Sequence, residues 1–137
     1  MAYWLMKSEP GSYSWDDLIA DGETPWDGVR NYQASNNMKA MKLGDRAFFY
    51  HSVKDKCVVG IVEVVKEYHP DPTDSKGRFG MVDVKPVRPF STPVTLAEIK
   101  QEAKLSDLAL VRQSRLSVLP LSADEWRHIC AMGSTEA

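Results

Sequence analysis

Four short segments of this sequence hold the polar and aromatic side chains that a binding site for a flat heterocycle would need. They are residues 7–10 (KSEP), 26–32 (WDGVRNY), 50–52 (YHS) and 112–115 (RQSR). An aromatic ring that stacks on a nucleobase stabilises binding by about 1–3 kcal/mol per base. Amide and hydroxyl groups pair with the donors and acceptors along the edge of the base. Strand ends on one rim of a barrel can converge in space, so the four segments could meet in one pocket, and their side chains are of the types that could hold a flat base.

The side chains of these segments divide into two expected roles. The base-binding candidates are Ser8, Trp26, Asn31, Tyr32, Tyr50, His51 and Ser52. The candidates for holding phosphates, or for the rim of the pocket, are Lys7, Arg30, Arg112, Ser114 and Arg115. Because a pocketed base must first leave its stack, at a cost of a few kcal/mol, the expected ligand is a single-stranded or flipped-out base.

Purely structural roles remain open for some of these residues. Trp26 and Tyr32 could pack in the core or at its rim, and Asn31 could terminate a turn. Arg30 and Arg115 could be structural, paired with Asp27 or Glu9. His51 could be a hydrogen-bonded structural histidine. The remaining tryptophans are expected in the core and both cysteines as buried thiols; these residues are Trp4, Trp15, Trp126, Cys57 and Cys130.

Two other classes of function are kept as alternatives. A hydrolase or nuclease would use Ser8 or Ser52 with His51. However, the sequence contains no G-x-S-x-G, H-E-x-x-H or P-C-x-x-C motif and no glycine-rich phosphate loop. We therefore expect no catalytic residue, metal or cofactor. A protein-interaction module without base binding would instead expose a large apolar patch.

Composition and charge limit the partners. The 137 residues carry a formal net charge of -2, which argues against a broad basic surface for duplex DNA. Residues 29–60 nevertheless hold six Lys and Arg against two Asp, so one basic segment lies within an acidic chain. No apolar run approaches the roughly 20 residues that span a bilayer, and no signal peptide is evident. The two cysteines favour a reducing, cytoplasmic location.

The elements that must position the four segments are strands and short helices. Strands are predicted over residues 2–6, 45–51, 57–68, 79–85 and 115–119, with the fourth ended by Pro86 and Pro89. An exposed, mobile loop is predicted over residues 69–78. Two of the segments follow predicted strand ends and one leads into the last strand, so we expect them at the rim of a curled sheet.

Helix starts are indicated by N-cap residues. One helix is predicted from Ser14, with Leu18 and Ile19 on its buried side. Another is predicted from Asn36 or Asn37 through Met38, Met41 and Leu43, with Gly44 after its end. Capping boxes predict helices from Thr95 and from Ser122, the latter ending at Gly133. The class is α+β, with a mainly antiparallel, curled sheet and peripheral helices.

Several motifs resemble the EVE domain family. They include YWLMKSEP, WDGVRNYQASNNMKAMKLGD, FFYHS and LVRQSRLSVLPLSADEW, and the similarity runs from Tyr3 to about Ile129. This chain departs from the family pattern at Ser35, where an arginine is frequent, and at Phe79, where a tryptophan is common.

The resemblance implies a PUA-like fold, related to YTH and ASCH domains. We expect a curled, mainly antiparallel β-barrel with peripheral short helices, forming a single domain over residues 1–137 with a frayed tail at 134–137. It also implies a non-enzymatic reader of a modified base, of the methyl- or hydroxymethylcytosine class, in DNA or RNA.

Overall fold

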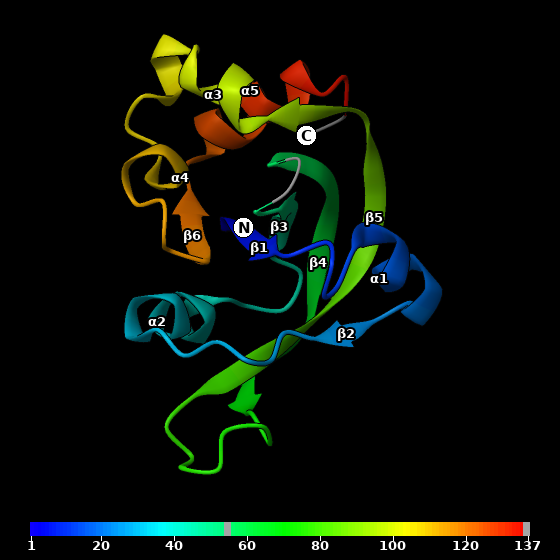
Figure 1. The fold of residues 1–137 in the computed structure, drawn as a ribbon, viewed down its shortest axis with the longest axis vertical. Helices are drawn as coiled ribbons and strands as arrows, with labels where there is room; N and C mark the ends of the chain where they lie inside the picture. Colours follow the sequence, from blue (N-terminus) through cyan, green and yellow to red (C-terminus); the bar gives the residue numbers. More distant parts are fainter. Residues whose placement is uncertain (54–55, 136–137) are drawn as a thin grey trace.

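A long curled hairpin forms the frame of the molecule (Figure 1). In the computed structural model, which describes residues 1–53 and 56–135, strands β4 (Cys57–Pro70) and β5 (Gly80–Thr95) pair antiparallel along most of their length. Val, Ile and Cys side chains make β4 a strong strand. Four register shifts interrupt the pairing, and such irregularities bend and twist a hairpin. The hairpin therefore curls around the elements that it encloses.

The sheet has the strand order β2-β5-β4-β3-β1-β6. Strand β3 (Arg46–His51) pairs antiparallel with β4, and β1 (Tyr3–Ser8) pairs parallel with β3. The two edges are β2 (Thr24–Pro25) on β5 and β6 (Val118–Leu121) on β1, both antiparallel. Among the described strands β1 and β3 are the one parallel pair, and β2 and β6 do not pair with each other. The predicted α+β, PUA-like, mainly antiparallel fold is confirmed, with its curled sheet open at the edges.

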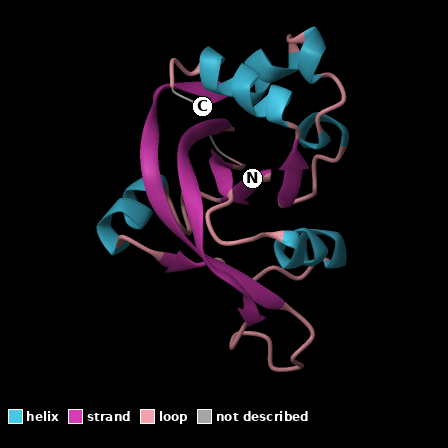
Figure 2. Cartoon of the chain, turned by 180° about the vertical axis from the view of Figure 1, so that it is seen from behind, coloured by secondary structure: helices cyan, strands magenta, loops and turns pink. Residues whose placement is uncertain are grey.

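Short helices surround the sheet, as the view from behind in Figure 2 shows. They are α1 (Trp15–Asp21), α2 (Tyr32–Ala40), α3 (Leu96–Lys100), the 3-10 helix η1 (Ala103–Leu105), α4 (Ala109–Arg112) and α5 (Ala123–Met132). The capping boxes predicted at Thr95 and Ser122 are both formed. No helix in the described part of the chain is long and apolar enough to cross a membrane.

The core is organised around stacked aromatic rings. The Phe48 and Trp126 rings stack with centroids 4.0 Å apart, and Phe90 meets Phe48 edge-on at 5.4 Å. Trp126 is fully buried, and Trp4 and Trp15 are nearly so, as predicted. Cys57 and Cys130 are buried thiols, also as predicted.

The prediction that prolines end the second long strand is wrong. Strand β5 continues through Pro86 and Pro89 to Thr95. These prolines stand opposite Val62 and Gly60, next to register shifts in the β4–β5 pair. A bulge leaves some backbone positions without a hydrogen-bonded partner in the ladder. Proline, which has no backbone N–H, is therefore tolerated at such a position.

Helix α2 begins earlier than predicted, because Asn31 rather than Asn36 or Asn37 is its N-cap. The Asn31 side chain accepts a hydrogen bond from the Ala34 N–H at 2.9 Å. The helix ends at Ala40, so Leu43 lies beyond it and is 62% exposed.

Two further details differ from prediction, whereas the frayed tail stays a prediction. Ile19, expected on the buried side of α1, is 52% exposed. The last strand covers Val118–Leu121 rather than residues 115–119, because residues 114 and 115 form a turn. At the tail, the Thr135 N–H donates to the Cys130 carbonyl at 2.9 Å, and residues 136–137 of the predicted frayed segment lie outside the described residues.

Gly60 is required where Trp15 crosses β4. A Cβ atom at Gly60 would lie 2.5 Å from two ring atoms of Trp15, whose other neighbour is the Phe49 ring at 5.5 Å. We expect Gly60→Ala to lower the free energy of unfolding by about 1–3 kcal/mol, as overpacking of a tight core does. Denaturant unfolding measures this. Gly11→Ala, where nothing lies within 4 Å of the added atom, is the control and should change little.

Candidate nucleic-acid interface

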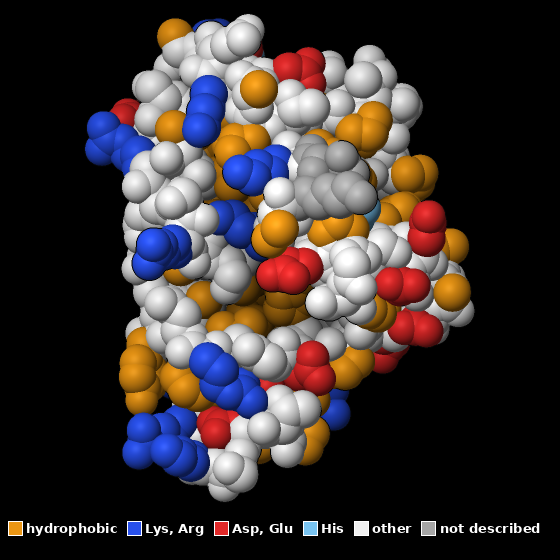
Figure 3. Space-filling view, viewed as in Figure 1, with side chains coloured by type: hydrophobic (Ala, Val, Ile, Leu, Met, Phe, Trp, Pro, Cys, Tyr) orange, Lys and Arg blue, Asp and Glu red, His pale blue; other side chains and the backbone are white. Residues whose placement is uncertain are grey.

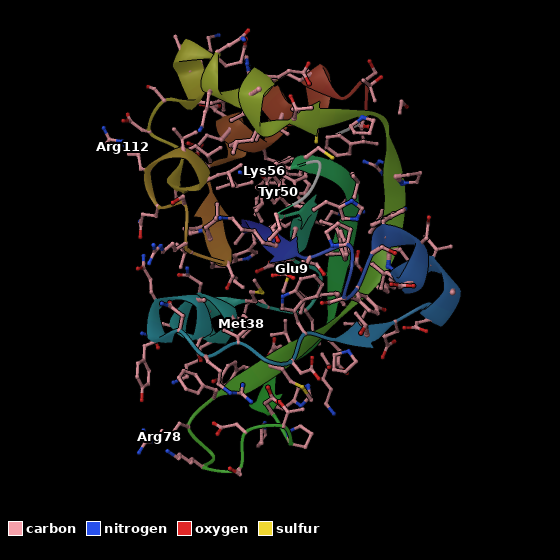
Figure 4. The ribbon with its side chains drawn as sticks, viewed as in Figure 1. Glu9, Met38, Tyr50, Lys56, Arg78 and Arg112 are labelled. Atoms are coloured by element: carbon pink, nitrogen blue, oxygen red, sulfur yellow. The ribbon has the colours of Figure 1, made fainter. Side chains whose placement is uncertain are left out.

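The parallel pairing of β1 with β3 brings two of the four predicted segments together. Parallel strands end at the same edge of a sheet, and here Lys7 lies opposite Tyr50 and Ser8 opposite His51. The pairing continues past the strands, since the Ser52 N–H donates to the Ser8 carbonyl at 2.9 Å. The two polar segments therefore form one continuous edge in the middle of the face shown in Figure 4, where Glu9 and Tyr50 are labelled.

A hollow of about 630 Å³, the central hollow, opens beside this edge. It is lined by Lys7, Ser8, Glu9, Ser12, Tyr13, Thr24, Pro25, Trp26, Asp27 and Gly28. The Trp26 N–H donates to the Val82 carbonyl at 2.7 Å, and its ring meets the Phe49 ring edge-on at 5.5 Å. Trp26 is therefore a fixed wall, only 8% exposed. Figure 3 shows the surface hollowed in the middle of this face, with hydrophobic side chains in the depression.

A second hollow of about 560 Å³, the upper hollow, shares Lys7 and Glu9 with the central one. Its other lining residues are Tyr50, Ser52, Val53, Lys56, Leu96, Leu110, Ser114, Arg115 and Ser117. Among the described residues that line it, the cations Lys7, Lys56 and Arg115 outnumber the one carboxylate, Glu9, so their net charge is positive. In Figure 4, Lys56 and Tyr50 are labelled directly above Glu9.

Burial tunes two ionisable groups at the base of the upper hollow. The Lys7 ammonium donates to the Ser114 carbonyl at 2.8 Å, and burial lowers the pKa of Lys7 from its usual value. Burial, reinforced by the nearby Cys57, raises the pKa of Tyr50 to about 12. The Tyr50 hydroxyl is therefore neutral at physiological pH.

A third hollow of about 320 Å³, the side hollow, lies between the start of α2 and the turn after α4. It is lined by Asn31, Gln33, Arg112, Gln113, Ser114, Arg115 and Leu116, so it shares Ser114 and Arg115 with the upper hollow. Arg112 pairs with Asp107 at 3.5 Å, but both side chains are mostly exposed, and such a pair is weak. The three hollows thus form a contiguous track with cations along it.

The structure brings most of the predicted site residues to this track. Those on it are Lys7, Ser8 and Trp26 in the central hollow, Tyr50, Ser52, Ser114 and Arg115 in the upper hollow, and Asn31 and Arg112 in the side hollow. The Ser8 hydroxyl also donates to the Tyr13 carbonyl at 2.5 Å, which holds the wall of the central hollow.

Three predicted residues do not line these hollows. His51 accepts a hydrogen bond from the Trp15 N–H through Nε2 at 3.1 Å, which is a structural role. Tyr32 is 61% exposed and packs against Phe79. Arg30 does not pair with Asp27, as the structural alternative supposed; it is bound by Asp71.

The Asp71 carboxylate joins the loop beside Trp26 to the tip of the long hairpin. It accepts hydrogen bonds from the Gly28 N–H at 2.9 Å, the Thr73 N–H at 2.7 Å and the Thr73 hydroxyl at 2.6 Å. It also pairs with Arg30 at 3.2 Å. Burial by itself would raise the pKa of Asp71, but the bonds from Thr73, Gly28 and Arg30 outweigh it and lower the pKa to about 2.

Residues 69–78 were predicted as an exposed, mobile loop. The prediction is wrong for the start of this segment, because β4 extends to Pro70 and Asp71 is only 3% exposed. The contact with Thr73 is local, but Arg30 and Gly28, the partners from the other loop, lie 41 and 43 residues away, so the sequence carries no local signal for this burial. Glu9 and Lys56 were also missed as lining residues, although each adjoins a predicted strand end.

Comparison with known proteins identifies the family. The EVE domain model matches residues 2–132. The chain belongs to the EVE domain family. Human thymocyte nuclear protein 1 is 36% identical to it, over 98% of this chain and 75% of the human protein.

Solved structures of EVE relatives superpose closely on this chain. A Rhodopseudomonas palustris protein solved by NMR is 52% identical, covers 98% of this chain and 94% of its own, and has a TM-score of 0.93. Human THYN1 in complex with DNA containing 5-methylcytosine is 35% identical, with full coverage of both chains and a TM-score of 0.92.

The prediction of a cytoplasmic location is corrected by the same comparison. The matching proteins of human, mouse and rat are all named as nuclear proteins. The error arose because free cysteines indicate only a reducing compartment, a property that the cytoplasm shares with the nucleus.

Asp71 should make the stability of this protein depend on acid pH. Its pKa is lowered in the folded state, so its contribution is present above the ordinary carboxyl pKa of 3.8 and is lost as pH falls toward 2. We expect Asp71→Asn to lower the free energy of unfolding by about 2 kcal/mol at pH 7. Below pH 4, the free energy of unfolding of the variant should decrease less steeply with falling pH than that of the unaltered protein. Denaturant unfolding from pH 2 to 7 measures both. The exposed Asp27→Asn is the control, and an equal effect there would contradict this role.

Proposed function

We propose that this chain is a reader of a modified nucleobase, which it binds as a single-stranded or flipped-out base in the central hollow. The observation that carries this proposal is the similarity, over the whole of this chain, to human THYN1, whose structure was determined with DNA containing 5-methylcytosine. The proposed ligand is accordingly a base of the methylcytosine class. Human THYN1 points to DNA as the polymer to be tested first.

The central hollow suits a cytosine-type base. At about 630 Å³ it is within the usual range of small-ligand sites. The Trp26 wall offers an aromatic surface, against which a base or its methyl group can pack. The Glu9 carboxylate can accept a hydrogen bond from the N4 amino group of cytosine, a group that thymine and uracil lack. Glu9 is exposed and forms no ion pair within the described part of the chain, so it is available for this bond.

The upper and side hollows suit the flanking phosphates. Lys56, Arg115 and Arg112 line them, and cations near a bound base position the backbone without reading sequence. This local concentration of positive charge provides the phosphate contacts that a net charge of -2 does not supply over the whole surface.

His51 is a poor general base in this geometry. The hydrogen bond from the Trp15 N–H occupies the Nε2 lone pair that would have to accept a proton from a serine. This bond supports a non-enzymatic reader over the Ser/His hydrolase or nuclease alternative.

A binding panel tests the proposed function. The probes are 12-nucleotide single DNA strands that differ only in their central base: cytosine, 5-methylcytosine, 5-hydroxymethylcytosine, N6-methyladenine or thymine. We expect 5-methylcytosine to bind better than cytosine by about fourfold, since burial of one methyl group is worth about 0.8 kcal/mol. The duplex form should bind more weakly than the single strand. Affinities measured by calorimetry at fixed salt that are equal for all five bases would overturn the proposal.

Replacement of Glu9 tests which edge of the base is read. 5-Methylcytosine and thymine carry the same methyl group, so the ratio of their affinities reports only how the protein reads the hydrogen-bonding edge of the base. We expect Glu9→Gln to reduce this ratio by about fivefold or more, because the amide can pair with either base whereas the carboxylate only accepts. Glu23→Gln removes the same charge from an exposed residue outside the hollow. It should leave the ratio unchanged, and an equal change in both variants would remove Glu9 from the base contact.

A further inference from the structure

An exposed aromatic pair lies outside the three hollows, and the proposed function does not use it. The Tyr32 ring packs against the Phe79 ring with centroids 4.9 Å apart and an angle of 37° between their planes. We call this pair the aromatic step. Tyr32 is the first residue of α2 and is 61% exposed, whereas Phe79 is partly buried at the hairpin tip. The step thus presents a large ring to solvent.

The aromatic step is held rigidly from below. The Arg30 guanidinium lies 5.8 Å from the centre of the Phe79 ring and is itself fixed by Asp71 at 3.2 Å and the Thr73 hydroxyl at 2.9 Å. The Asp74 carboxylate accepts hydrogen bonds from the Phe79 N–H and the Arg78 N–H, both at 2.8 Å. These contacts fix Phe79, and Tyr32 packs against it, so stacking of a base on Tyr32 builds on a partly ordered support and costs less conformational entropy.

Cations surround the step. Lys76 and Arg78 are exposed on the hairpin tip, and Arg78 points outward from it in Figure 4. The Lys39 ammonium lies 5.5 Å from the centre of the neighbouring Tyr68 ring. Aromatic faces interleaved with lysine and arginine are the surface on which proteins bind single-stranded nucleic acid, whereas a protein-docking patch would be more apolar.

The step is continuous with the site already described. Asn31 and Gln33, which flank Tyr32 in the chain, both line the side hollow. The side hollow shares Arg115 with the upper hollow, and the upper hollow shares Lys7 with the central one. A strand with one base in the central hollow can therefore follow these cations to Tyr32.

We propose that the aromatic step is a second nucleotide-binding site, where Tyr32 stacks on a base that flanks the one held in the central hollow. Arg78 and Lys39 contact the backbone phosphates beside it. This inference rests on the proposed function for its ligand, a single strand of nucleic acid. It extends the site by at least one nucleotide beyond the base that is read.

Strand length separates the step from the hollow. The probes are the mononucleotide 5-methyl-dCMP, followed by NMR titration, and the 12-nucleotide strand with central 5-methylcytosine. We expect Tyr32→Ala to weaken binding of the 12-mer about fivefold or more, which corresponds to the loss of one stacked base, and to leave the mononucleotide affinity unchanged. Tyr32→Phe, which keeps the ring, should bind like the unaltered protein. The melting temperature of each variant verifies that the exposed substitution has not disturbed the fold.

A second arm uses salt. Arg78→Ala should reduce the slope of log affinity against log salt for the 12-mer by about 0.7, the value for one phosphate of a single strand. Arg127→Ala, on α5 and outside the three hollows, is the matched control and should leave the slope unchanged.

Two outcomes would overturn the aromatic step. If Tyr32→Ala leaves 12-mer binding unchanged while Glu9→Gln still alters the 5-methylcytosine to thymine ratio, the step has no role, although the proposed function stands. If Tyr32→Ala weakens the mononucleotide and the 12-mer equally, its effect lies in the hollow. If Glu9→Gln changes nothing but Tyr32→Ala still weakens only the longer strand, the assignment of the central hollow fails and the step is supported.

Discussion

The parallel pairing of β1 with β3 is the constraint on which the rest of the site depends. Both strands must end at the same edge, and this puts Ser8 beside His51 and Ser52 although more than 40 residues separate them in the chain. An antiparallel partner would send one of the two polar segments to the opposite edge. The segments before α1 and around β2 meet that edge on one side, and the turn before β6 meets it on the other, so the hollows form there.

A second long-range contact fixes what lies below the edge. The Asp71 carboxylate holds Gly28, next to Trp26, and Arg30, next to Phe79. One buried side chain thus sets the position of the central hollow and of the aromatic step relative to the hairpin tip.

Local signals in the sequence predicted local structure well. The capping boxes at Thr95 and Ser122 depend on contacts three residues apart, and the β-branched run of β4 depends on its own residues; both were predictable. The motif similarity was sufficient for the fold, and nine of the twelve predicted site residues line the hollows. What failed depends on partners distant in sequence. Pro86 is accommodated because of a register shift against β4, and Asp71 is buried because Gly28 and Arg30 reach it.

Aromatic residues show the same division. Trp4, Trp15 and Trp126 were assigned correctly to the core, because large apolar rings are usually buried. Tyr32 was assigned to the base pocket with its neighbours in the 26–32 segment, but the turn into α2 directs it to the other side of Asn31. Segment composition identifies a region of interest, whereas the face on which each side chain lies is decided by the helix that begins there.

The open sheet leaves two unpaired edges, and both are poor templates for another chain. β2 has only two residues and one of them is Pro25, whereas β6 has four and includes the exposed Pro120. A short strand that contains proline offers few free N–H groups, so it resists the edge-to-edge association by which sheets aggregate. The sheet therefore stays open between β2 and β6 without offering an edge on which another chain would readily pair.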